Sequence, residues 1–130
     1  MIPATEAFVE AGRVHTTTVR RAVGGDCAGD VDWRPVGKTG TIEIGIWLPP
    51  AHRGHGVGTE AQRQLVEYLF ATSPVHRLQA GTEAGNIAEQ RALERVGFQR
   101  EGVLRGMYFR DGEYRDSVMY GLLRHEWTRR

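Results

Sequence analysis

The chain has 130 residues, with 17 Lys and Arg against 16 Asp and Glu, and Cys27 is its single cysteine. A chain of this length forms one domain with a real hydrophobic core. The balanced charge excludes a global basic field for nucleic acid, and one cysteine excludes an intrachain disulfide framework. No apolar run of about 18 residues is present that could cross a membrane. We therefore expect a single cytoplasmic domain over residues 1–130 that binds neither nucleic acid nor membrane.

The first part of the chain is predicted to be mostly strand. Residues 4–11 favour a short helix with Thr5 as its N-cap. Alternating β-branched residues on either side of "GGD" predict a hairpin over residues 14–33. After the loop "RPVGKTG", the segment "TIEIGIWL" predicts a third strand. Its apolar side chains share one face: Ile42, Ile44, Ile46 and Leu48.

The second part alternates helices and strands. A helical period of apolar residues predicts a helix over residues 57–70, which Ser73-Pro74 ends, and "VHRLQAGT" predicts the next strand. Two strands joined by such a helix form a right-handed parallel βαβ unit. "NIAEQRALERVGF" predicts a second helix with Asn86 as N-cap and Gly97 as its stop.

The chain is predicted to end in a hairpin. Asp111-Gly112 is a two-residue hairpin signal between "GVLRGMYFR" and "EYRDSVMYGLL". The segment "LLRHEWTRR" predicts the end of a strand followed by a solvated basic tail. The order β-β-β-α-β-α-β-β therefore predicts an α/β (α+β) domain with a mixed sheet.

Three alternating glycines separate the third strand from the first long helix, in "AHRGHGVGTEA". A helix N-terminus leaves backbone N–H groups unpaired and carries partial positive charge, so it favours anions. Gly54, Gly56 and Gly58 remove side chains that would keep phosphate oxygens from these donors, and Arg53 adds a charge. Taken alone, the stretch is also compatible with a tight turn beside a surface arginine.

Two common phosphate loops do not fit this stretch. A P-loop requires Gly-Lys-Ser/Thr, which does not follow the glycines. A dinucleotide loop would use Glu83 as its ribose-binding acid, but it requires a third glycine where Thr59 stands.

Arg53-x-x-Gly56-x-Gly58 resembles the acetyl-coenzyme A pyrophosphate motif of the GNAT superfamily of N-acetyltransferases. The segments "AGDVDW", "EIGIWLPPAHRGHGVGTEA" and "NIAEQRALERVGFQREGVLRGMYFRDGEYRDSVMYGLLRHEW" resemble its ribosomal-protein alanine acetyltransferase branch (RimJ/RimL type), over about residues 14–127. The resemblance implies a mixed, mostly antiparallel sheet with a central splayed parallel strand pair and flanking helices. Relatives begin with a strand and two helices, so this chain looks N-terminally shortened.

The resemblance also implies that acetyl-CoA is the acetyl donor. Its pantetheine arm would enter the gap between the splayed strands, and its pyrophosphate would lie on the glycine loop. The residues so assigned to the cofactor are Trp47, Leu48, Arg53, Gly54, His55, Gly56, Val57, Gly58, Thr59 and Asn86. Asn86 is equally interpreted as a simple helix N-cap.

The implied reaction is direct attack of a neutral primary amine on the thioester, with a peptide N-terminus or a small molecule as acceptor. It requires a proton acceptor, carbonyl polarisation and a proton for the leaving thiolate. Glu43 faces away from the isoleucines and is a candidate base, although an ordinary ion pair is the alternative. Glu83 is a second candidate.

The proton donor is where the chain departs from the family pattern. Relatives place a tyrosine where Leu93 stands or a serine where Glu89 stands. Tyr120 is the remaining candidate, with a place in the core as the alternative, and water could also protonate the thiolate.

The sequence also bears on metal binding, on oligomeric state and on an alternative function. His52 and His55 have a His-x-x-His spacing, but a glycine loop is a poor scaffold for metal ligands, so we expect no metal site. A sheet face without its usual N-terminal helices favours a homodimer. A non-catalytic acyl-CoA-binding or regulatory module remains the alternative function.

Overall fold

A computed structural model of the chain describes residues 6–7, 15–20, 27–54 and 56–128. Seven strands form one sheet in the order β1-β2-β3-β4-β5-β7-β6. Adjacent strands are antiparallel except β4 and β5, which are parallel. The strands are β1 (Glu6–Ala7), β2 (His15–Arg20), β3 (Cys27–Pro35), β4 (Thr41–Trp47), β5 (Arg77–Glu83), β6 (Gln99–Arg110) and β7 (Glu113–Leu123). The predicted mixed, mostly antiparallel sheet is confirmed.

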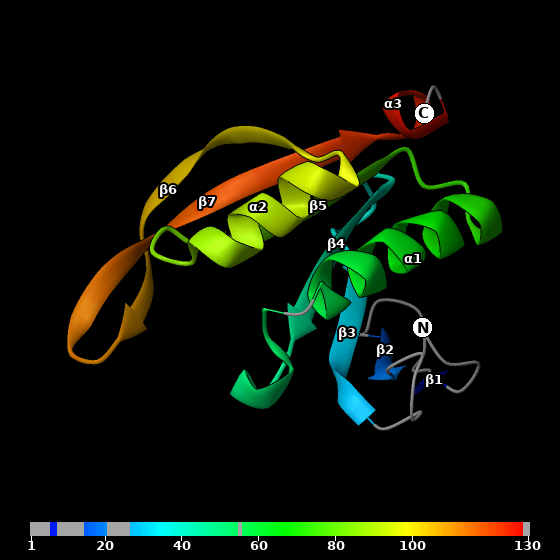
Figure 1. Ribbon diagram of the computed structural model, residues 1–130. Helices are drawn as coiled ribbons and strands as arrows, with labels where there is room; N and C mark the ends of the chain where they lie inside the picture. The colour runs from blue at the N-terminus through cyan, green and yellow to red at the C-terminus, as the bar shows by residue number, and fades with distance from the viewer. Residues whose placement is uncertain (1–5, 8–14, 21–26, 55, 129–130) are drawn as a thin grey trace.

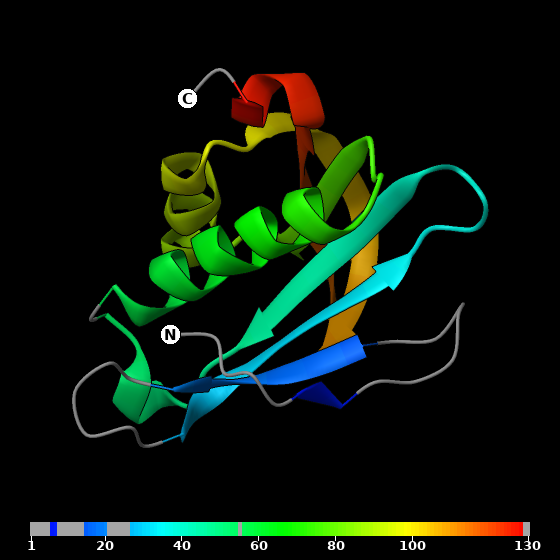
Figure 2. The same cartoon turned by 90° about the vertical axis from the view of Figure 1, so that its right-hand side faces the viewer.

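Two long helices cover one face of the sheet, as Figures 1 and 2 show. Helix α1 (Val57–Thr72) ends where the Ser73 N–H donates to the Leu69 carbonyl, directly before a proline. Helix α2 (Ile87–Val96) begins at the Asn86 cap and ends at Gly97, whose φ of 123° favours glycine. Both helices match their predicted positions, and we call the sheet face that they leave uncovered the open face.

The hydrophobic core lies between these helices and the sheet. Strands contribute every second residue to it, for example Leu78 and Ala80 from β5, because successive side chains alternate between the two faces. Helix α1 contributes one apolar stripe: Ala61, Leu65, Val66, Leu69 and Phe70. Each fully buried leucine stabilises the fold by roughly 2 kcal/mol. The core therefore fixes which side chains of β4, β5 and β7 point to the open face.

Strands β6 and β7 form the predicted closing hairpin. Asp111 and Gly112 form the turn with φ values of 54° and 79°. Positive φ at both central residues is the pattern of a type I′ turn, which matches the right-handed twist of the strands. The far part of this hairpin extends away from the helices (Figure 1).

The predicted N-terminal helix is wrong where the structure can test it. Glu6–Ala7 forms the short strand β1, which pairs with Thr16 and Thr17 of β2. Pairing with a neighbouring strand overrides the weak helical preference of so short a segment. The rest of residues 4–11 lies outside the described residues.

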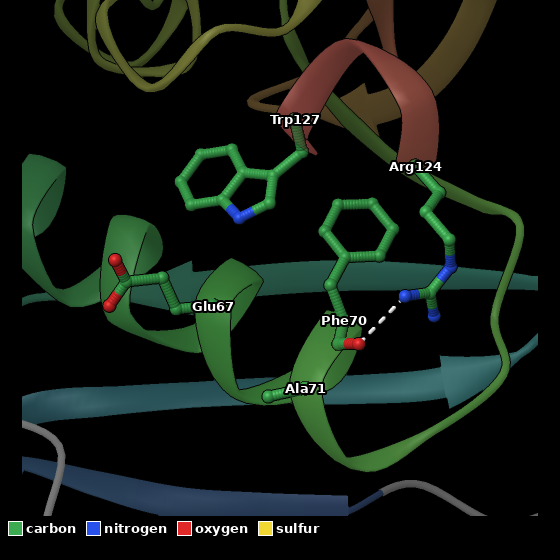
Figure 3. A pocket seen from close by; sticks show the side chains of 5 residues that line it. All are labelled: Glu67, Phe70, Ala71, Arg124 and Trp127. Atoms are coloured by element: carbon green, nitrogen blue, oxygen red, sulfur yellow. Dashed lines mark hydrogen bonds between the residues drawn. The ribbon is translucent and has the colours of Figure 1, made fainter. Parts of the chain in front are cut away.

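The predicted solvated tail is also wrong between residues 124 and 128. This segment forms a short helix, α3 (Arg124–Thr128), and the Trp127 ring lies near Phe70 of α1 (Figure 3). The Arg124 guanidinium donates to the carbonyls of Phe70, Ser73 and Val75 at 2.5–2.9 Å. These carbonyls lie in or beyond the last turn of α1, where a helix lacks internal donors. Arg124 therefore caps α1 from a distant part of the sequence.

Replacing Arg124 tests this cap. We expect Arg124→Ala to lower the free energy of unfolding by about 2 kcal/mol, because three carbonyls lose a charged donor. Thermal and urea unfolding followed by circular dichroism measure the change. Arg91→Ala, at an exposed position of α2, is the matched control and should leave stability nearly unchanged. Equal stability of both variants would contradict a capping role for Arg124.

Candidate active site

The parallel strands β4 and β5 separate after three paired positions. Their register joins Thr41 to Arg77, Ile42 to Leu78 and Glu43 to Gln79, and it ends there. Both strands continue for four more residues, to Trp47 and Glu83. On its other side, β5 stays paired with β7 through Glu83. The result is a wedge-shaped gap in the sheet with its apex at Glu43 and Gln79, as the family resemblance implied.

The backbone groups of β4 at this gap belong to alternate residues. The Trp47 carbonyl points toward β3, because a Cβ added to Gly29 would lie 2.2 Å from its oxygen. Successive residues of a strand direct their N–H and C=O groups to opposite edges. Ile44 and Ile46 therefore present theirs to the gap. An extended ligand that pairs with this edge would meet Ile44 and Ile46 rather than Trp47, whose side chain is 59% exposed.

The glycine loop joins the wide end of the gap to α1. Gly54 and Gly56 have φ values of 78° and 77°, and Gly56 is the N-cap of α1 in the left-handed conformation. Gly58 serves a different purpose, since a Cβ there would lie 3.2 Å from Leu48 Cδ1 and 3.6 Å from Ile46 Cδ1. Two glycines thus shape the loop, and the third brings α1 close to the end of β4.

The first turn of α1 provides anion donors beside this loop. The Glu60 N–H donates to the Gly56 carbonyl, so the N–H groups of residues 57–59 precede the first intrahelical bond. The buried Val57 holds this turn on the core. His55 lies outside the described residues, so its predicted contact stays a prediction.

Arg53 is fixed to β4 rather than extended into solvent. Its Nε donates to the Leu48 carbonyl at 2.7 Å, which ties the loop to the strand end. Arg53 thereby brings a positive charge to the loop that leads into α1, where it adds to the partial positive charge of the helix N-terminus. The loop, Arg53 and the first turn of α1 form a site for an anion with several oxygens.

A polar contact joins the second turn of α1 to the first turn of α2. The Gln62 amide Nε2 donates to Glu89 Oε1 at 3.1 Å and to the Gly58 carbonyl at 3.1 Å. Gln62 is 1% exposed, and its Oε1 has no hydrogen-bond partner among the described residues. Burial raises the pKa of Glu89 to about 7, while the hydrogen bond from Gln62 acts in the opposite direction. Sequence reasoning noted Glu89 only as a departure from the family pattern.

Asn86 is confirmed as the N-cap of α2. Its Oδ1 accepts a hydrogen bond from the Glu89 N–H at 3.2 Å. This cap holds Glu89 in the first turn, so its side chain can reach Gln62 of α1. The predicted contact of Asn86 with the cofactor stays a prediction.

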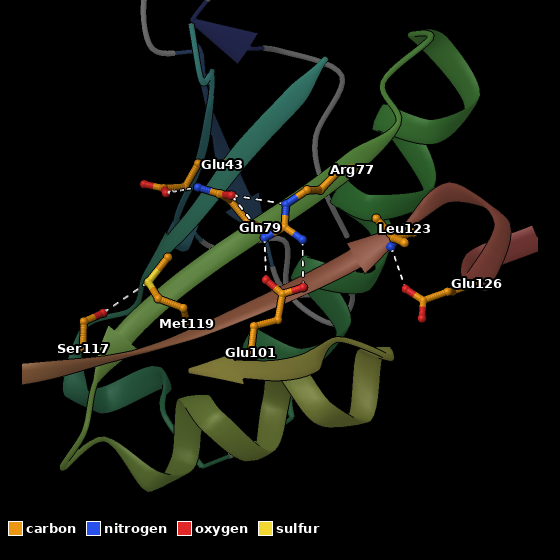
Figure 4. Close-up of polar contacts among 8 residues, drawn as sticks. All are labelled: Glu43, Arg77, Gln79, Glu101, Ser117, Met119, Leu123 and Glu126. Atoms are coloured by element: carbon orange, nitrogen blue, oxygen red, sulfur yellow. Dashed lines mark hydrogen bonds and ion pairs between the residues drawn. The ribbon is translucent and has the colours of Figure 1, made fainter. Parts of the chain in front are cut away.

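Glu43 closes the apex of the gap on the open face, in a row of polar contacts across the sheet (Figure 4). Its Oε1 accepts from Gln79 Nε2 at 2.9 Å, and its Oε2 is ion-paired with Arg34. Gln79 Oε1 in turn accepts from Arg77, which is paired with Glu101 of β6. Glu43 is thus at the predicted place, but it is an anchored carboxylate with two partners.

Asp32 of β3 is the acidic residue that sequence reasoning missed. It pairs with Gly45 across the β3–β4 ladder, and a Cβ on Gly45 would lie 2.9 Å from Asp32 Oδ1. Its contact with Arg34 is long, at 3.5 Å. Burial is the largest cause of a raised Asp32 pKa, with the Glu43 charge adding to it and Arg34 opposing it. Alternation along β3 and β4 was a signal that could have placed Asp32 beside Glu43.

Two glycines border the gap on the open face. Gly45 of β4 and Gly81 of β5 each lie two residues beyond the last paired position, Glu43 and Gln79. A Cβ on Gly81 would lie 2.8 Å from the Met119 sulfur. Because neither strand carries a side chain at these points, the gap can be approached from the open face past Asp32 and Met119.

The structure does not bring Tyr120 and Glu43 together. Tyr120 is fully buried on the helix-covered face, and its hydroxyl donates to Glu94 Oε2 of α2 at 2.8 Å. Burial and this hydrogen bond raise the Tyr120 pKa. These contacts favour the core alternative for Tyr120 over proton donation.

Glu83, the second candidate base, has two arginine partners. Glu83 Oε1 is paired with Arg110 and Arg115 at 2.8 and 3.3 Å, so it is a neutralised carboxylate at the end of β5. Within the part of the chain that the structure describes, no group of three or more His, Cys, Asp or Glu residues could hold a metal ion.

The chain matches the family model of the acetyltransferase (GNAT) domain over residues 5–99. This chain belongs to the GNAT acetyltransferase family. A "Probable N-acetyltransferase YjcK" from Bacillus subtilis is 37% identical over 67% of this chain and 48% of its own length. The ribosomal protein uS5 alanine N-acetyltransferase of Escherichia coli is 32% identical over 65% of this chain and 44% of its own length. The GNAT chain described here thus spans about half the length of these relatives.

Solved structures agree with the GNAT fold. A spermidine N-acetyltransferase from Vibrio cholerae, solved with CoA and spermine, aligns with a TM-score of 0.80 and 22% identity. The alignment covers 88% of this chain and 68% of that chain. A "Probable acetyltransferase" aligns with a TM-score of 0.74 and 31% identity over 79% of this chain and 59% of that chain. The fold and the family resemblance predicted from the sequence are confirmed.

The raised pKa of Glu89 makes the free energy of unfolding of the chain depend on pH. In the unfolded chain this carboxyl has its ordinary pKa near 4.5, and in the fold it has a pKa of about 7. The charged form is therefore disfavoured in the fold: the penalty is absent below pH 4.5, grows between pH 4.5 and 7, and is constant above. At pH 8 it amounts to roughly 3 kcal/mol at most.

We expect Glu89→Gln to be more stable than the native chain at pH 8 and nearly as stable at pH 4.5. The amide cannot ionise and can still accept from Gln62. Urea unfolding at half-unit pH steps measures the difference between the two proteins. A difference that stays constant from pH 4.5 to 8 would contradict the assignment of the raised pKa to Glu89.

Proposed function

We propose that this chain is an acetyl-CoA-dependent N-acetyltransferase domain that spans residues 1–130 and transfers an acetyl group to a primary amine. The observation that carries the proposal is the continuity of two sites. The free β4 edge at the gap leads, through a short 3-10 helix (Pro50–His52), into the glycine loop and the N-terminus of α1. An extended arm that ends in a diphosphate fits both parts at once.

The cofactor residues follow from this placement. The backbone at Ile44, Ile46 and Leu48 would pair with the pantetheine amides, with Asn86 near the other side of the arm. The pyrophosphate would lie on Arg53, Gly54, His55, Gly56, Val57, Gly58 and Thr59. Acetyl-CoA, when bound, supplies the thioester whose acetyl group is transferred. Trp47 would contribute through its exposed indole rather than its carbonyl.

The acceptor amine would approach from the open face, past Gly45 and Gly81. Asp32 and Glu43 lie at this opening, and their carboxylates would attract a cationic amine and accept its proton, directly or through water. Asp32 suits proton transfer better, because burial raises its pKa and Glu43 is held by Arg34 and Gln79. Relatives named for a ribosomal-protein alanine and for spermidine support an amine acceptor of either the peptide or the polyamine class.

Titration calorimetry with acetyl-CoA tests the proposal. We expect the native chain to bind acetyl-CoA and Arg53→Ala to bind at least about tenfold more weakly, because a charged contact and the anchor at Leu48 are both lost. Arg95→Ala, an exposed arginine in the last turn of α2, is the matched control with native affinity. Absence of binding at millimolar acetyl-CoA would refute the proposal.

Release of free CoA thiol with a panel of amines separates the enzyme from its alternative. Spermidine and a short peptide with an N-terminal alanine represent the two acceptor classes. Turnover with either one, lowered in Asp32→Asn and Glu43→Gln, supports an enzyme. Binding of acetyl-CoA without turnover, unchanged in these variants, would identify a non-catalytic acyl-CoA-binding or regulatory module.

We also propose that the chain acts in the cytoplasm as a homodimer. The far part of the β6–β7 hairpin exposes large apolar side chains: Leu104 (44%), Met107 (60%), Phe109 (65%) and Tyr114 (74%). The rings of Phe109 and Tyr114 lie 4.9 Å apart between centroids, so these two exposed rings form one apolar patch. Such a patch favours association with a second copy. Among the described helices, none has the length and apolar character needed to span a membrane.

Light scattering of the purified chain tests the dimer. We expect the mass of a dimer at micromolar concentration, and that of a monomer for Phe109→Asp, which places a charge in the patch. Circular dichroism should show the same fold for both, since Phe109 is exposed. A native chain that is monomeric at 100 micromolar, a concentration of the order at which weak dimers form, would contradict the proposal.

A further inference from the structure

The Glu89 carboxyl is half-buried between α1 and α2 and has the Gln62 amide as its hydrogen-bond partner. Its Oε1 accepts from Gln62 Nε2 at 3.1 Å, and burial raises its pKa while this hydrogen bond opposes the rise. No charged side chain of α1, β5 or α2 among the described residues contributes to that shift. A carboxyl left in such a place stays protonated to higher pH than an exposed one. Carboxyls of this kind are typical of sites that donate protons.

The contact between Gln62 and Glu89 lies over the gap. Both helices start where a diverging strand ends: α1 follows β4 through the glycine loop, and α2 follows β5 after Glu83. Gln62 also donates to the carbonyl of Gly58, the residue that packs on Ile46 and Leu48 of β4. Glu89 therefore sits on the helix-covered side of the gap, and Asp32 and Glu43 sit on the open face.

An unpaired atom next to Glu89 indicates a ligand donor at the same place. Gln62 Oε1 is buried and has no partner among the described residues. A buried amide oxygen without a donor costs about 1–3 kcal/mol, so such atoms are normally satisfied. An amide N–H of an arm lying in the gap would satisfy it. The arm would then pass within reach of the Glu89 carboxyl.

We propose that Glu89 is the acid that protonates the leaving sulfur during acetyl transfer, an inference that rests on the proposed function. The two carboxyl groups of the site would then act from opposite faces of the sheet. Asp32 or Glu43 serves the entering amine on the open face, and Glu89 serves the departing thiolate on the helix side. The different environments of the two carboxyl groups would thus make one a base and the other an acid.

The amine nitrogen forms a bond to the acetyl carbonyl carbon, and the carbon–sulfur bond breaks with its electron pair on sulfur. The Glu89 carboxyl gives its proton to that sulfur and becomes a carboxylate, which Gln62 Nε2 stabilises by its hydrogen bond. The nitrogen loses its extra proton to the open-face carboxylate or to water. Exchange with solvent then restores the proton on Glu89, so the net products are an amide and a thiol.

The pH profile of kcat distinguishes this role from a structural one. Native kcat should fall above about pH 7, where Glu89 loses its proton. Glu89→Gln keeps the size and hydrogen bonding of the side chain but has no acidic proton. We therefore expect its kcat to be at least about tenfold lower than that of the native chain, without the decline at high pH. Glu89→Asp should recover part of the rate and of the pH dependence. Glu67→Gln, an exposed glutamate of α1, is the matched control with a native profile.

Two further measurements keep the outcomes separate. Calorimetry should show that Glu89→Gln binds acetyl-CoA within about threefold of the native chain, and loss of its binding would overturn the assignment as an acid. Infrared spectra of the native chain without acetyl-CoA should show one protonated carboxyl that titrates near pH 7 and is missing in Glu89→Gln. A native chain that binds acetyl-CoA and turns over, with Glu89→Gln unchanged in rate and profile, would overturn this inference alone. A native chain that fails to bind acetyl-CoA would overturn the proposed function and this inference together.

Discussion

The divergence of β4 and β5 beyond Glu43 and Gln79 is the constraint on which the site depends. A parallel pair that stayed bonded would satisfy the Ile44 and Ile46 backbone groups internally and leave no gap. The strands separate while each remains paired on its other side, β4 with β3 and β5 with β7. The sheet therefore stays intact around an unpaired edge. That edge has a cost in backbone hydrogen bonds, which an extended ligand would recover.

The surrounding packing keeps the gap open and directs what enters it. Gly58 lets α1 lie close to Ile46 and Leu48, so the α1 N-terminus is held at the wide end of the gap. Arg53 ties the loop to Leu48. On the open face, the contact of Glu43 with Gln79 fixes the apex. Helices on one face and carboxylates on the other give the gap two chemically different sides.

The sequence predicts the elements well, because their signals are local. The period of α1, the Asn86 cap, the Gly97 stop and the Asp111-Gly112 turn each act within a few residues. The parallel pairing of β4 and β5 follows from the helix between them. The glycine loop was found for the same reason. Its three glycines lie within five residues of one another, and the family resemblance supplied their purpose.

The features that sequence reasoning missed are contacts between distant segments. Strand β1 depends on β2 pairing, and the Arg124 cap joins residues about 50 positions apart. The pKa of Glu89 depends on burial between two helices, which no local pattern reports. Asp32 could be placed beside Glu43 by strand alternation, but its position over Gly45 required the register. Tyr120 was given two alternatives, and only its contact with Glu94 favours the core.

Amide chemical shifts during a titration with acetyl-CoA test the central claim most directly. If the gap holds the pantetheine arm, the largest changes will occur at Ile44, Ile46 and the first turn of α1, residues 57–59. Amides near the hollow formed by Glu67, Phe70, Ala71, Arg124 and Trp127 will stay unchanged, since this hollow lies at the opposite end of α1 (Figures 1 and 3). Changes centred on that hollow, with the β4 edge unaffected, would contradict the account.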